Sequence, residues 1–368
     1  MQRRNFFRSI ALGGVSAALS PIVKAAPLAH TAKEKPATNV KDALPRNQPS
    51  MPGRYPGKVA RATHPGCIVD GQPSEEITYG MLKKCMQQLT GQDNLREAWL
   101  QFVTPDDVIG LKVNPIAGKL LSTSHALTQS IINQLEEAGI SRDHIIIWDR
   151  READLKESGF TPENYPGIRI IGTEYQDDNG SYINAEGRFY GEERIDKDQF
   201  FFVDLEGEYD AYTMPFMING GKHSYFTRIC TEMVTKIINV PVLKNAGTTI
   251  TSCMKNLAFG SITNTARLHG PMWHDTCASV CAFPPLRDKV VLNITDGMIG
   301  CFDGGPAANP QFICHYNTLL VGTDPVAVDR IGYDMVIAKR IEEGVQEEEK
   351  AGARTFMDMA QEFKLGIA

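Results

Sequence analysis

Hydrophobic and polar positions form two patterns along the chain. One is the three-to-four-residue period of helices, and the other is the continuous apolar run of buried strands. Apolar side chains recur every three or four positions over 74–89, behind Ser74, which predicts a helix capped by that serine. The continuous apolar runs 108–113 and 145–148 predict buried strands. The stretch between these two strands begins at Thr123 or Ser124, has a helical period and stops at Gly139. Strand, helix and strand in this order predict a parallel crossover.

The same alternation returns in the second half of the chain, which extends the predicted sheet. Further strands are predicted at 168–171, 237–243, 289–294 and 318–322, and further helices at 226–236, 251–258, from Pro325 onward and over about 345–363. We therefore predict an α/β fold with a mostly parallel sheet and helices on both faces.

Two segments depart from this pattern. Residues 27–66 are rich in Pro, Lys, Ala and Asn and lack an apolar period, which predicts a linker or extended arm. Residues 172–224 are polar, aromatic and punctuated by glycine, which predicts an inserted antiparallel or irregular section. The main domain is expected to span 67–368, with the insertion at about 172–224.

The first 26 residues read as a twin-arginine signal peptide. Arg3 and Arg4 precede two phenylalanines, a mildly apolar stretch runs from Ser9 to Val23, and small residues follow at the expected cleavage site. This apolar stretch is too short to span about 30 Å of hydrocarbon. We expect the export machinery of the twin-arginine route as a partner, a periplasmic location, and no membrane span in the mature chain.

Composition limits the remaining function classes. Removal of the signal leaves about 340 residues, enough for one large or two moderate domains. Hydrophobic residues make up 42% and charged residues 22% of the chain, as in ordinary globular proteins. A net charge of −6 without a basic run argues against a nucleic-acid partner. Eight cysteines are too few for a disulfide scaffold, although a Cys301–Cys314 pair is an open alternative.

Polar residues follow several predicted strands, where ligands bind in open α/β sheets. They are Lys112 with Asn114, Asp149 with Arg150, Lys244 with Asn245, Asp296, and Asp324. A solvated loop also begins with polar residues, so any one of them has a structural explanation. Their repetition, and the mixture of both charges, predicts a binding cleft at this edge of the sheet.

The segment after Lys244 suits an anionic ligand. Lys255 and Asn256 follow on the next predicted helix, and lysines at such positions clamp an anion or, when desolvated, act as bases of lowered pKa. A lysine pair at a surface helix start is the structural alternative. The segment is not a P-loop, and the chain has neither a dinucleotide fingerprint nor a GxSxG hydrolase elbow.

Metal binding is the second chemical hypothesis. Residues 267–281 contain two histidines, an aspartate and two cysteines, but they lack the paired CxxC spacing of zinc sites and the CxxCxxC run of iron–sulfur clusters. Buried free thiols at Cys277 and Cys281 are the structural alternative. His269 and Asp296 are the candidate ligands of a divalent metal, and the cofactor is otherwise unknown.

Several of these segments together resemble the DUF362 family, a domain family of unassigned function. The resemblance covers about 105–340 and rests on 108–115, 243–244, 254–262 with His269, 292–297 and 319–329. It implies an α/β fold, and many members of the family look like twin-arginine-exported proteins. Some members carry ferredoxin-type modules, which this chain lacks. A histidine often stands two residues after the lysine at Lys244, whereas this chain has Ala246 there.

The sequence therefore predicts an exported protein that binds a metal or an anion and acts on a small anionic substrate. A binding protein without turnover and a structural partner of an exported complex are the alternatives. The candidate catalytic residues are Lys112, Lys244, Lys255 and His269, the candidate ligand-binding residues are Asn114, Asn245, Asn256, Gly297 and Asp324, and the candidate metal ligands are His269 and Asp296.

Overall fold

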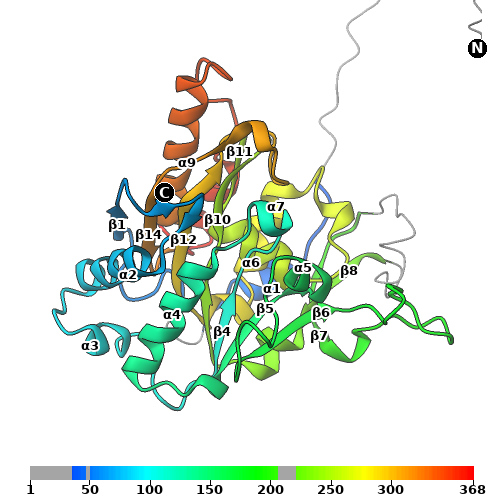
Figure 1. Cartoon of the computed structure of the whole chain (residues 1–368). Coiled ribbons are helices and arrows are strands. Elements are labelled where there is room, and N and C mark those ends of the chain that lie inside the picture. The colour runs from blue at the N-terminus through cyan, green and yellow to red at the C-terminus, as the bar shows by residue number, and fades with distance from the viewer. Residues whose placement is uncertain (1–34, 47–49, 206–220) are drawn as a thin grey trace, which may run out of the picture. The chain divides into compact units, whose positions relative to one another are not determined.

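A large central sheet organises the chain, in the order β1-β14-β12-β9-β4-β5-β6 (Figure 1). The structure is a computed structural model that describes residues 35–46, 50–205 and 221–368. Five neighbouring strands of the sheet pair in parallel, namely β12 (Val290–Cys301), β9 (Lys236–Asn239), β4 (Ile109–Lys112), β5 (Ile145–Arg151) and β6 (Arg169–Glu174). The predicted signal peptide lies outside the described residues.

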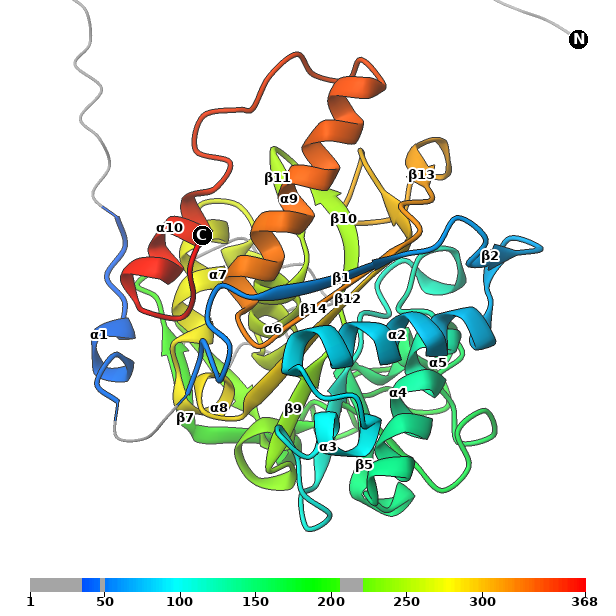
Figure 2. The ribbon, with the colours of Figure 1, turned by 90° about the vertical axis from the view of Figure 1, so that its left-hand side faces the viewer.

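Helices cover both faces of the sheet, which confirms the predicted α/β class (Figure 2). Side chains of β5 alternate between two cores, with Ile145 and Ile147 on one side and Ile146 and Trp148 on the other. The first core is covered by α2 (Glu75–Thr90), α3 (Leu95–Trp99) and α4 (His125–Ala138), and the second by α6 (Cys253–Ser261), α7 (Trp273–Cys281), α8 (Pro284–Arg287), α9 (Pro325–Glu342) and α10 (Thr355–Glu362).

The caps predicted for two helices are confirmed. The Ser74 hydroxyl accepts a hydrogen bond from Ile77 N at the start of α2, and the Ser124 hydroxyl accepts one from Leu127 N at the start of α4. α4 ends at Gly139, whose φ of 97° is readily adopted only by glycine.

The predicted linker over 27–66 is wrong for its last part. β1 (Val59–Thr63) is an edge strand of the main sheet and pairs antiparallel with β14 (Thr318–Gly322). Its inward positions are only alanines, Ala60 and Ala62, so the strand has a weak hydrophobic signal. Upstream of it lie the short helix α1 (Val40–Ala43) and a fully buried Met51.

The predicted helix over 226–236 is also wrong. β8 (His223–Thr227) pairs antiparallel with β7 (Ile195–Phe202), and only Ile229–Met233 forms a turn, of the π-helical type. Buried aromatic residues on β8 give this segment the apolar content of a helix, but neighbouring aromatics pack across the two strands instead. The two strands form an antiparallel section that begins within the predicted insertion and ends at Thr227, shortly after it; residues 206–220 lie outside the described residues.

Two further boundaries differ from the prediction. The strand predicted over 237–243 is interrupted by Pro241, which has no N–H for a ladder, so that β9 ends and β10 (Val242–Ala246) begins. β10 pairs antiparallel with β11 (Thr249–Thr251). β12 runs seven residues past its predicted end, so Asp296 and Gly297 lie within a strand instead of a loop.

The remaining elements are short. The last helix, α10, is shorter than the 345–363 predicted, because Gly352 adopts a positive φ just before it. The others are β2 (Ile68–Val69), β3 (Gln72–Pro73), α5 (Glu152–Glu157) and β13 (Ile313–Cys314). In the part of the chain that the structure describes, no helix combines the length and apolarity needed to cross a bilayer.

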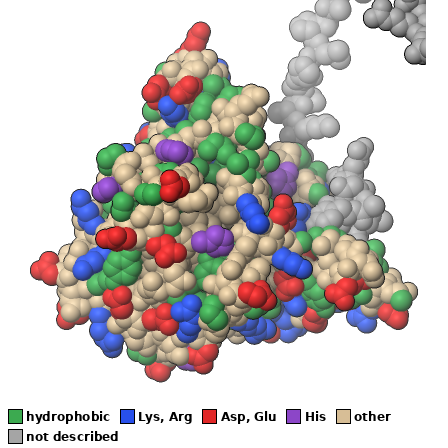
Figure 3. Space-filling view, viewed as in Figure 1, with side chains coloured by type: hydrophobic (Ala, Val, Ile, Leu, Met, Phe, Trp, Pro, Cys, Tyr) green, Lys and Arg blue, Asp and Glu red, His purple; other side chains and the backbone are tan. Residues whose placement is uncertain are grey.

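Surface charge is mixed on the face drawn in Figure 3, where Lys and Arg side chains lie among Asp and Glu side chains. No continuous basic area covers this face. The absence of a nucleic-acid partner, expected from the net charge of −6, stays a prediction.

The start of α6 is held by a buried carboxylate, Asp329 of α9. It accepts hydrogen bonds from Cys253 N at 2.6 Å and Met254 N at 3.0 Å, and burial raises its pKa to about 6. Because its pKa in the folded state exceeds that in the unfolded state, this group favours folding at low pH. That contribution is lost progressively as the pH rises from about 4 through about 6.

Replacement Asp329→Asn is therefore expected to flatten the pH dependence of stability. Urea unfolding measures the free energy of unfolding at each pH. Between pH 4 and pH 7 this free energy should fall by ~2–3 kcal/mol more in the wild type than in the variant. The exposed Asp358→Asn of α10 is the matched control and should keep the wild-type slope. Equal slopes for Asp329→Asn and the wild type would show that Asp329 does not titrate in this range.

Candidate anion-binding site

A cavity of about 110 Å³ lies beyond the carboxyl ends of β4 and β5, beside β10 and the start of α6. We call it the lysine cavity, after Lys244 and Lys255. Its walls are Asn114, Ile116, Asp149, Arg150, Lys244, Thr251, Lys255, Asn256, Phe259, Gly260, His269 and Pro306.

The topology explains the position of the lysine cavity. The chain passes from β4 outward to β5 and β6, and then returns to β9 on the other side of β4 before reaching β12. The order of strands therefore reverses between β4 and β9. Crossover loops leave the sheet in opposite directions at such a point, which opens a crevice beyond the carboxyl ends of the strands.

Lys244 is the most unusual group in the cavity. Its side chain is fully buried, and its ammonium donates a hydrogen bond to Ile116 O at 3.0 Å. No carboxylate among the described residues forms an ion pair with it. Desolvation and the nearby charge of Lys255 lower the pKa of Lys244 to about 7. A pKa in this range lets Lys244 gain or lose a proton near neutral pH, which suits a group that transfers protons.

Lys255 and Arg150 add positive charge to the same cavity. Lys255 donates to Thr251 Oγ1 at 3.3 Å, and burial lowers its pKa to about 8. Arg150 Nε lies 3.7 Å from Glu174 Oε1, a carboxylate that it shares with Arg151. The cationic groups of this cavity thus outnumber the carboxylates that neutralise them, which favours an anionic ligand.

His269 contributes a neutral imidazole. Its ring packs on Phe259 at 4.4 Å between centroids, and Nδ1 lies 2.9 Å from Thr265 O. A carbonyl only accepts hydrogen bonds, so Nδ1 carries the proton and Nε2 is left as an acceptor. Partial desolvation lowers the pKa of His269, and the positive charge of Lys255 lowers it further, so that the ring is neutral at pH 7.

Lys112, predicted as a catalytic residue, lies beneath the cavity and not in its wall. It is fully buried, forms an ion pair with Asp149, and donates to Val113 O at 2.8 Å and Asn256 Oδ1 at 3.1 Å. All three ammonium protons are therefore engaged. This residue neutralises Asp149 and fixes Asn256, and both partners line the cavity.

Gly260 makes room for this ion pair. A Cβ atom at position 260 would lie 2.2 Å from Lys112 Cε and 3.1 Å from Asp149 Oδ1. The backbone of α6 therefore approaches β4 and β5 more closely than any other residue would allow.

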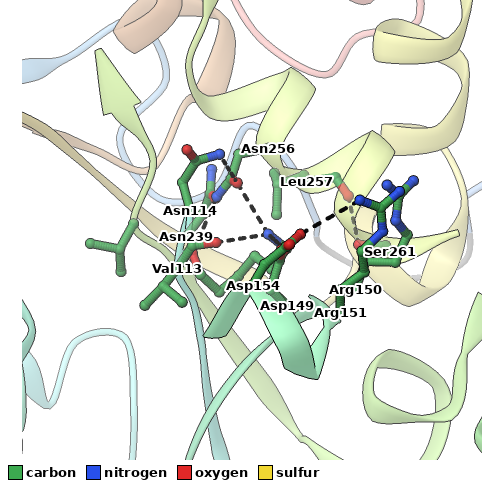
Figure 4. Close-up of polar contacts among 12 residues, drawn as sticks. Val113, Asn114, Asp149, Arg150, Arg151, Asp154, Asn239, Asn256, Leu257 and Ser261 are labelled. Carbon is green, nitrogen blue, oxygen red and sulfur yellow. Dashed lines mark hydrogen bonds and ion pairs between the residues drawn. The ribbon is translucent and has the colours of Figure 1, made fainter. Parts of the chain in front are cut away.

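A chain of buried amides joins the cavity to the sheet (Figure 4). Asn114 Nδ2 donates to Asn256 Oδ1 at 2.9 Å, and Asn256 Nδ2 donates to Asn239 Oδ1 at 2.8 Å. Asn239 in turn donates to Asn293 Oδ1 at 2.9 Å. These contacts connect β4, β9, β12 and α6, so the side chains in the cavity wall are held rigidly.

Asp296 lies at a different cavity from His269, so the structure does not bring the two predicted metal ligands together. Asp296 is buried in a cavity of about 510 Å³, where it accepts hydrogen bonds from Ser124 N at 2.9 Å and Met298 N at 3.2 Å. Desolvation raises its pKa. Its carboxylate therefore caps α4 and shares no cavity with His269.

Three more predicted ligand-binding residues have structural roles and do not line the lysine cavity. Asn245 closes the turn between β10 and β11 through Gly247 O, and Gly297 lies within β12 opposite Thr318. Asp324 caps α9 and also accepts hydrogen bonds from Gly57 N and Ile367 N. Polar residues at strand ends are equally useful as caps, and the sequence does not separate the two uses.

The composition of the lysine cavity does not suit a cation. His269 is the one predicted metal ligand in its wall, and Lys244, Lys255 and Arg150 would repel a divalent ion. Across residues 35–46, 50–205 and 221–368, no cluster of three His, Cys, Asp or Glu side chains could hold a metal. Cys277 and Cys281 are buried free thiols, and Cys301 and Cys314 are likewise unpaired.

The predicted roles omitted Asp149, Arg150, Thr251 and Asn239. Asp149 and Arg150 were recognised as polar residues after the predicted strand 145–148, but they received no role in the site. Asn239 had no usable signal, since it was placed inside an uninterrupted strand. Five predicted residues do converge on the lysine cavity: Asn114, Lys244, Lys255, Asn256 and His269.

Comparisons with known proteins concern family and fold. The chain is similar, with 10% identity and a TM-score of 0.40, to the crystal structure of a Thermotoga maritima protein, a target of the Northeast Structural Genomics Consortium. The match covers 72% of this chain and 59% of that chain. A search of curated proteins found no match.

The family comparison covers the part of the chain that builds the lysine cavity. A family model described as "Domain of unknown function (DUF362)" matches residues 109–334, which is more than half of the 368 residues. The matched segment begins at β4, ends within α9 and includes every residue in the wall of the cavity. The chain therefore belongs to the DUF362 family.

Proposed function

We propose that the protein is an enzyme that binds a small anion in the lysine cavity and transfers a proton to or from it. The observation that carries this proposal is a fully buried lysine, Lys244, in the wall of a cavity and without a carboxylate partner among the described residues; burial and Lys255 lower its pKa to about 7. A lysine with a purely structural role would not stabilise the fold in such a site, because desolvation of its charge lowers the free energy of unfolding. Perturbed groups of this kind in cavities are typical of acid–base catalysis.

The other groups would divide the remaining tasks. Lys255 and Arg150 would hold the charge of the anion, since Asp149 is already neutralised by Lys112. The neutral His269 would accept a hydrogen bond or a proton through Nε2. The volume of about 110 Å³ limits the enclosed part of a substrate to a few non-hydrogen atoms.

Binding of an anion is expected to be coupled to proton uptake. At pH 8 Lys244 is mostly neutral, and a bound anion raises its pKa again, so the complex takes up a fraction of a proton. At pH 6 Lys244 is already charged and uptake should be close to zero. Affinity should fall as the pH rises through 7 to 8. Calorimetric titration of acetate, glycolate, sulfate and phosphate, in buffers of different ionisation enthalpy, measures both quantities.

The control is Lys244→Met, which should bind more weakly and lose the part of the uptake at pH 8 that Lys244 supplies, while the part from Lys255, whose pKa is about 8, remains. If the purified protein binds none of the four anions at millimolar concentration, the proposed function is wrong. Equal uptake at pH 6 and pH 8 would assign the site to a simple anion-binding role without a titrating lysine.

We also propose that the protein is exported through the twin-arginine route to the periplasm. The support is the Arg3-Arg4 pair ahead of a short apolar stretch. Replacement of both residues by lysine should leave the chain in the cytoplasmic fraction of cells, while Arg8→Lys should not change its location. A periplasmic fraction unchanged by the double replacement would contradict this route.

A further inference from the structure

Asn114 leaves a buried hydrogen-bond acceptor without a partner in the wall of the lysine cavity. Its side chain is 5% exposed, and its Nδ2 is engaged with Asn256, but Oδ1 has no hydrogen-bond partner among the described residues. A buried carbonyl oxygen without a partner is destabilising, so such groups occur mainly where a ligand or water completes them.

The orientation of this amide is fixed by Lys112. An ammonium can only donate, so the Asn256 atom that lies 3.1 Å from Lys112 Nζ must be the oxygen. The same oxygen then accepts from Asn114, which must offer its NH₂ group to it. Asn114 Oδ1 consequently lies on the other side of the amide (Figure 4). Flipping Asn114 would place two oxygens in contact.

Arg150 supplies a complementary unsatisfied group. Its Nε also lacks a hydrogen-bond partner among the described residues, since 3.7 Å to Glu174 is an ion-pair distance and not a hydrogen bond. The same cavity therefore contains cationic hydrogen-bond donors, such as Arg150, which suit an anion. It also contains one acceptor, Asn114 Oδ1, which suits an O–H or N–H group of the ligand.

We infer that the ligand of the lysine cavity is an anion that also carries an O–H or N–H group, which donates to Asn114. This inference rests on the proposed function and narrows its substrate class. Hydroxycarboxylates and hydrogenphosphate have both features. Acetate and sulfate have the charge alone and leave Asn114 Oδ1 unpaired. A site built to bond a ligand hydroxyl rejects the analogue that lacks it, because its own buried group stays unsatisfied.

Two matched pairs of anions test the inference on the unmodified protein. Calorimetric titration at pH 6.5, where Lys244 is charged, should show glycolate binding at least ten times more tightly than acetate, or phosphate at least ten times more tightly than sulfate. A preference in the first pair alone identifies an organic acid, and one in the second pair alone identifies an inorganic or esterified phosphate.

The variant Asn114→Leu assigns the preference to the amide. In this variant the tenfold preference for the hydroxyl-bearing anion of each pair should disappear. Equal affinities within both pairs on the unmodified protein, or a preference that survives in Asn114→Leu, would overturn the inference and leave anion binding intact. Failure of all four anions to bind would overturn the proposed function as well. The comparison on the unmodified protein decides the question even if the variant does not fold.

Discussion

Replacement of Lys244 by methionine is expected to make the ligand-free protein more stable, although it removes the group on which the proposed function depends. Methionine keeps the length of the side chain and removes the charge that burial penalises. Loss of the hydrogen bond to Ile116 O offsets part of the gain. The free energy of unfolding at pH 6 should rise by about 1–3 kcal/mol.

The pH dependence of this effect has a defined sign. The pKa of Lys244 is about 7 in the folded protein and near its usual 10.5 in the unfolded chain. Between these values the unfolded chain holds more protons, so wild-type stability rises with pH. The advantage of Lys244→Met should therefore be largest below pH 7 and shrink as the pH approaches 10.

Thermal unfolding at pH 6 and pH 9 measures this difference, with the exposed Lys83→Met of α2 as the matched control. The control should leave the melting temperature nearly unchanged at both values. A Lys244→Met protein that is less stable than the wild type at pH 6 would show that Lys244 is a structural residue. Anion affinity of the same variant should fall at least tenfold.

Replacement of Asp149 by asparagine is expected to destabilise the fold strongly. Asparagine has the same shape, but it leaves Lys112 fully buried without a counter-charge. Removal of one member of a buried ion pair typically costs about 3–5 kcal/mol, because the remaining charge stays desolvated. Urea unfolding should show a loss in this range.

The pair is best measured as a double-mutant cycle. Its single variants are Lys112→Met and Asp149→Asn, and their combination removes both charges and should recover most of the stability lost in Asp149→Asn. Asp334→Asn, which breaks an exposed ion pair with Arg330, is the control and should cost less than about 0.5 kcal/mol. A cost for Asp149→Asn as small as that of the control would mean that Lys112 is neutral in the fold.

The fold was largely predictable because its strongest signals are local. Continuous apolar runs gave β4 and β5, and the caps at Ser74 and Ser124 gave the starts of α2 and α4. The errors arise where tertiary contacts decide. β1 forms because β14 has a free edge, and its two inward alanines give almost no hydrophobic period. Pro241 divides a run that looks continuous by apolar content alone.

Part of the candidate site could be predicted from the sequence. The rule that ligands bind at carboxyl strand ends led to Asn114 and Lys244, and proximity in sequence added Lys255 and Asn256. The same rule also selected Asp324, which is a cap, because a polar residue after a strand satisfies either role. Burial separates these cases, and burial depends on the packing of α6 against the sheet, which no local pattern contains.

The antiparallel edge formed by β1 also determines when the protein can finish folding. Val59 pairs with Gly322, and β14 lies between β1 and β12, so two distant parts of the chain must meet before the sheet is complete. Contacts of such sequence separation slow folding. A chain still on the ribosome has β1 long before its partner exists. The last step of folding therefore waits for nearly complete synthesis, and any cellular process that requires the finished protein must act after translation.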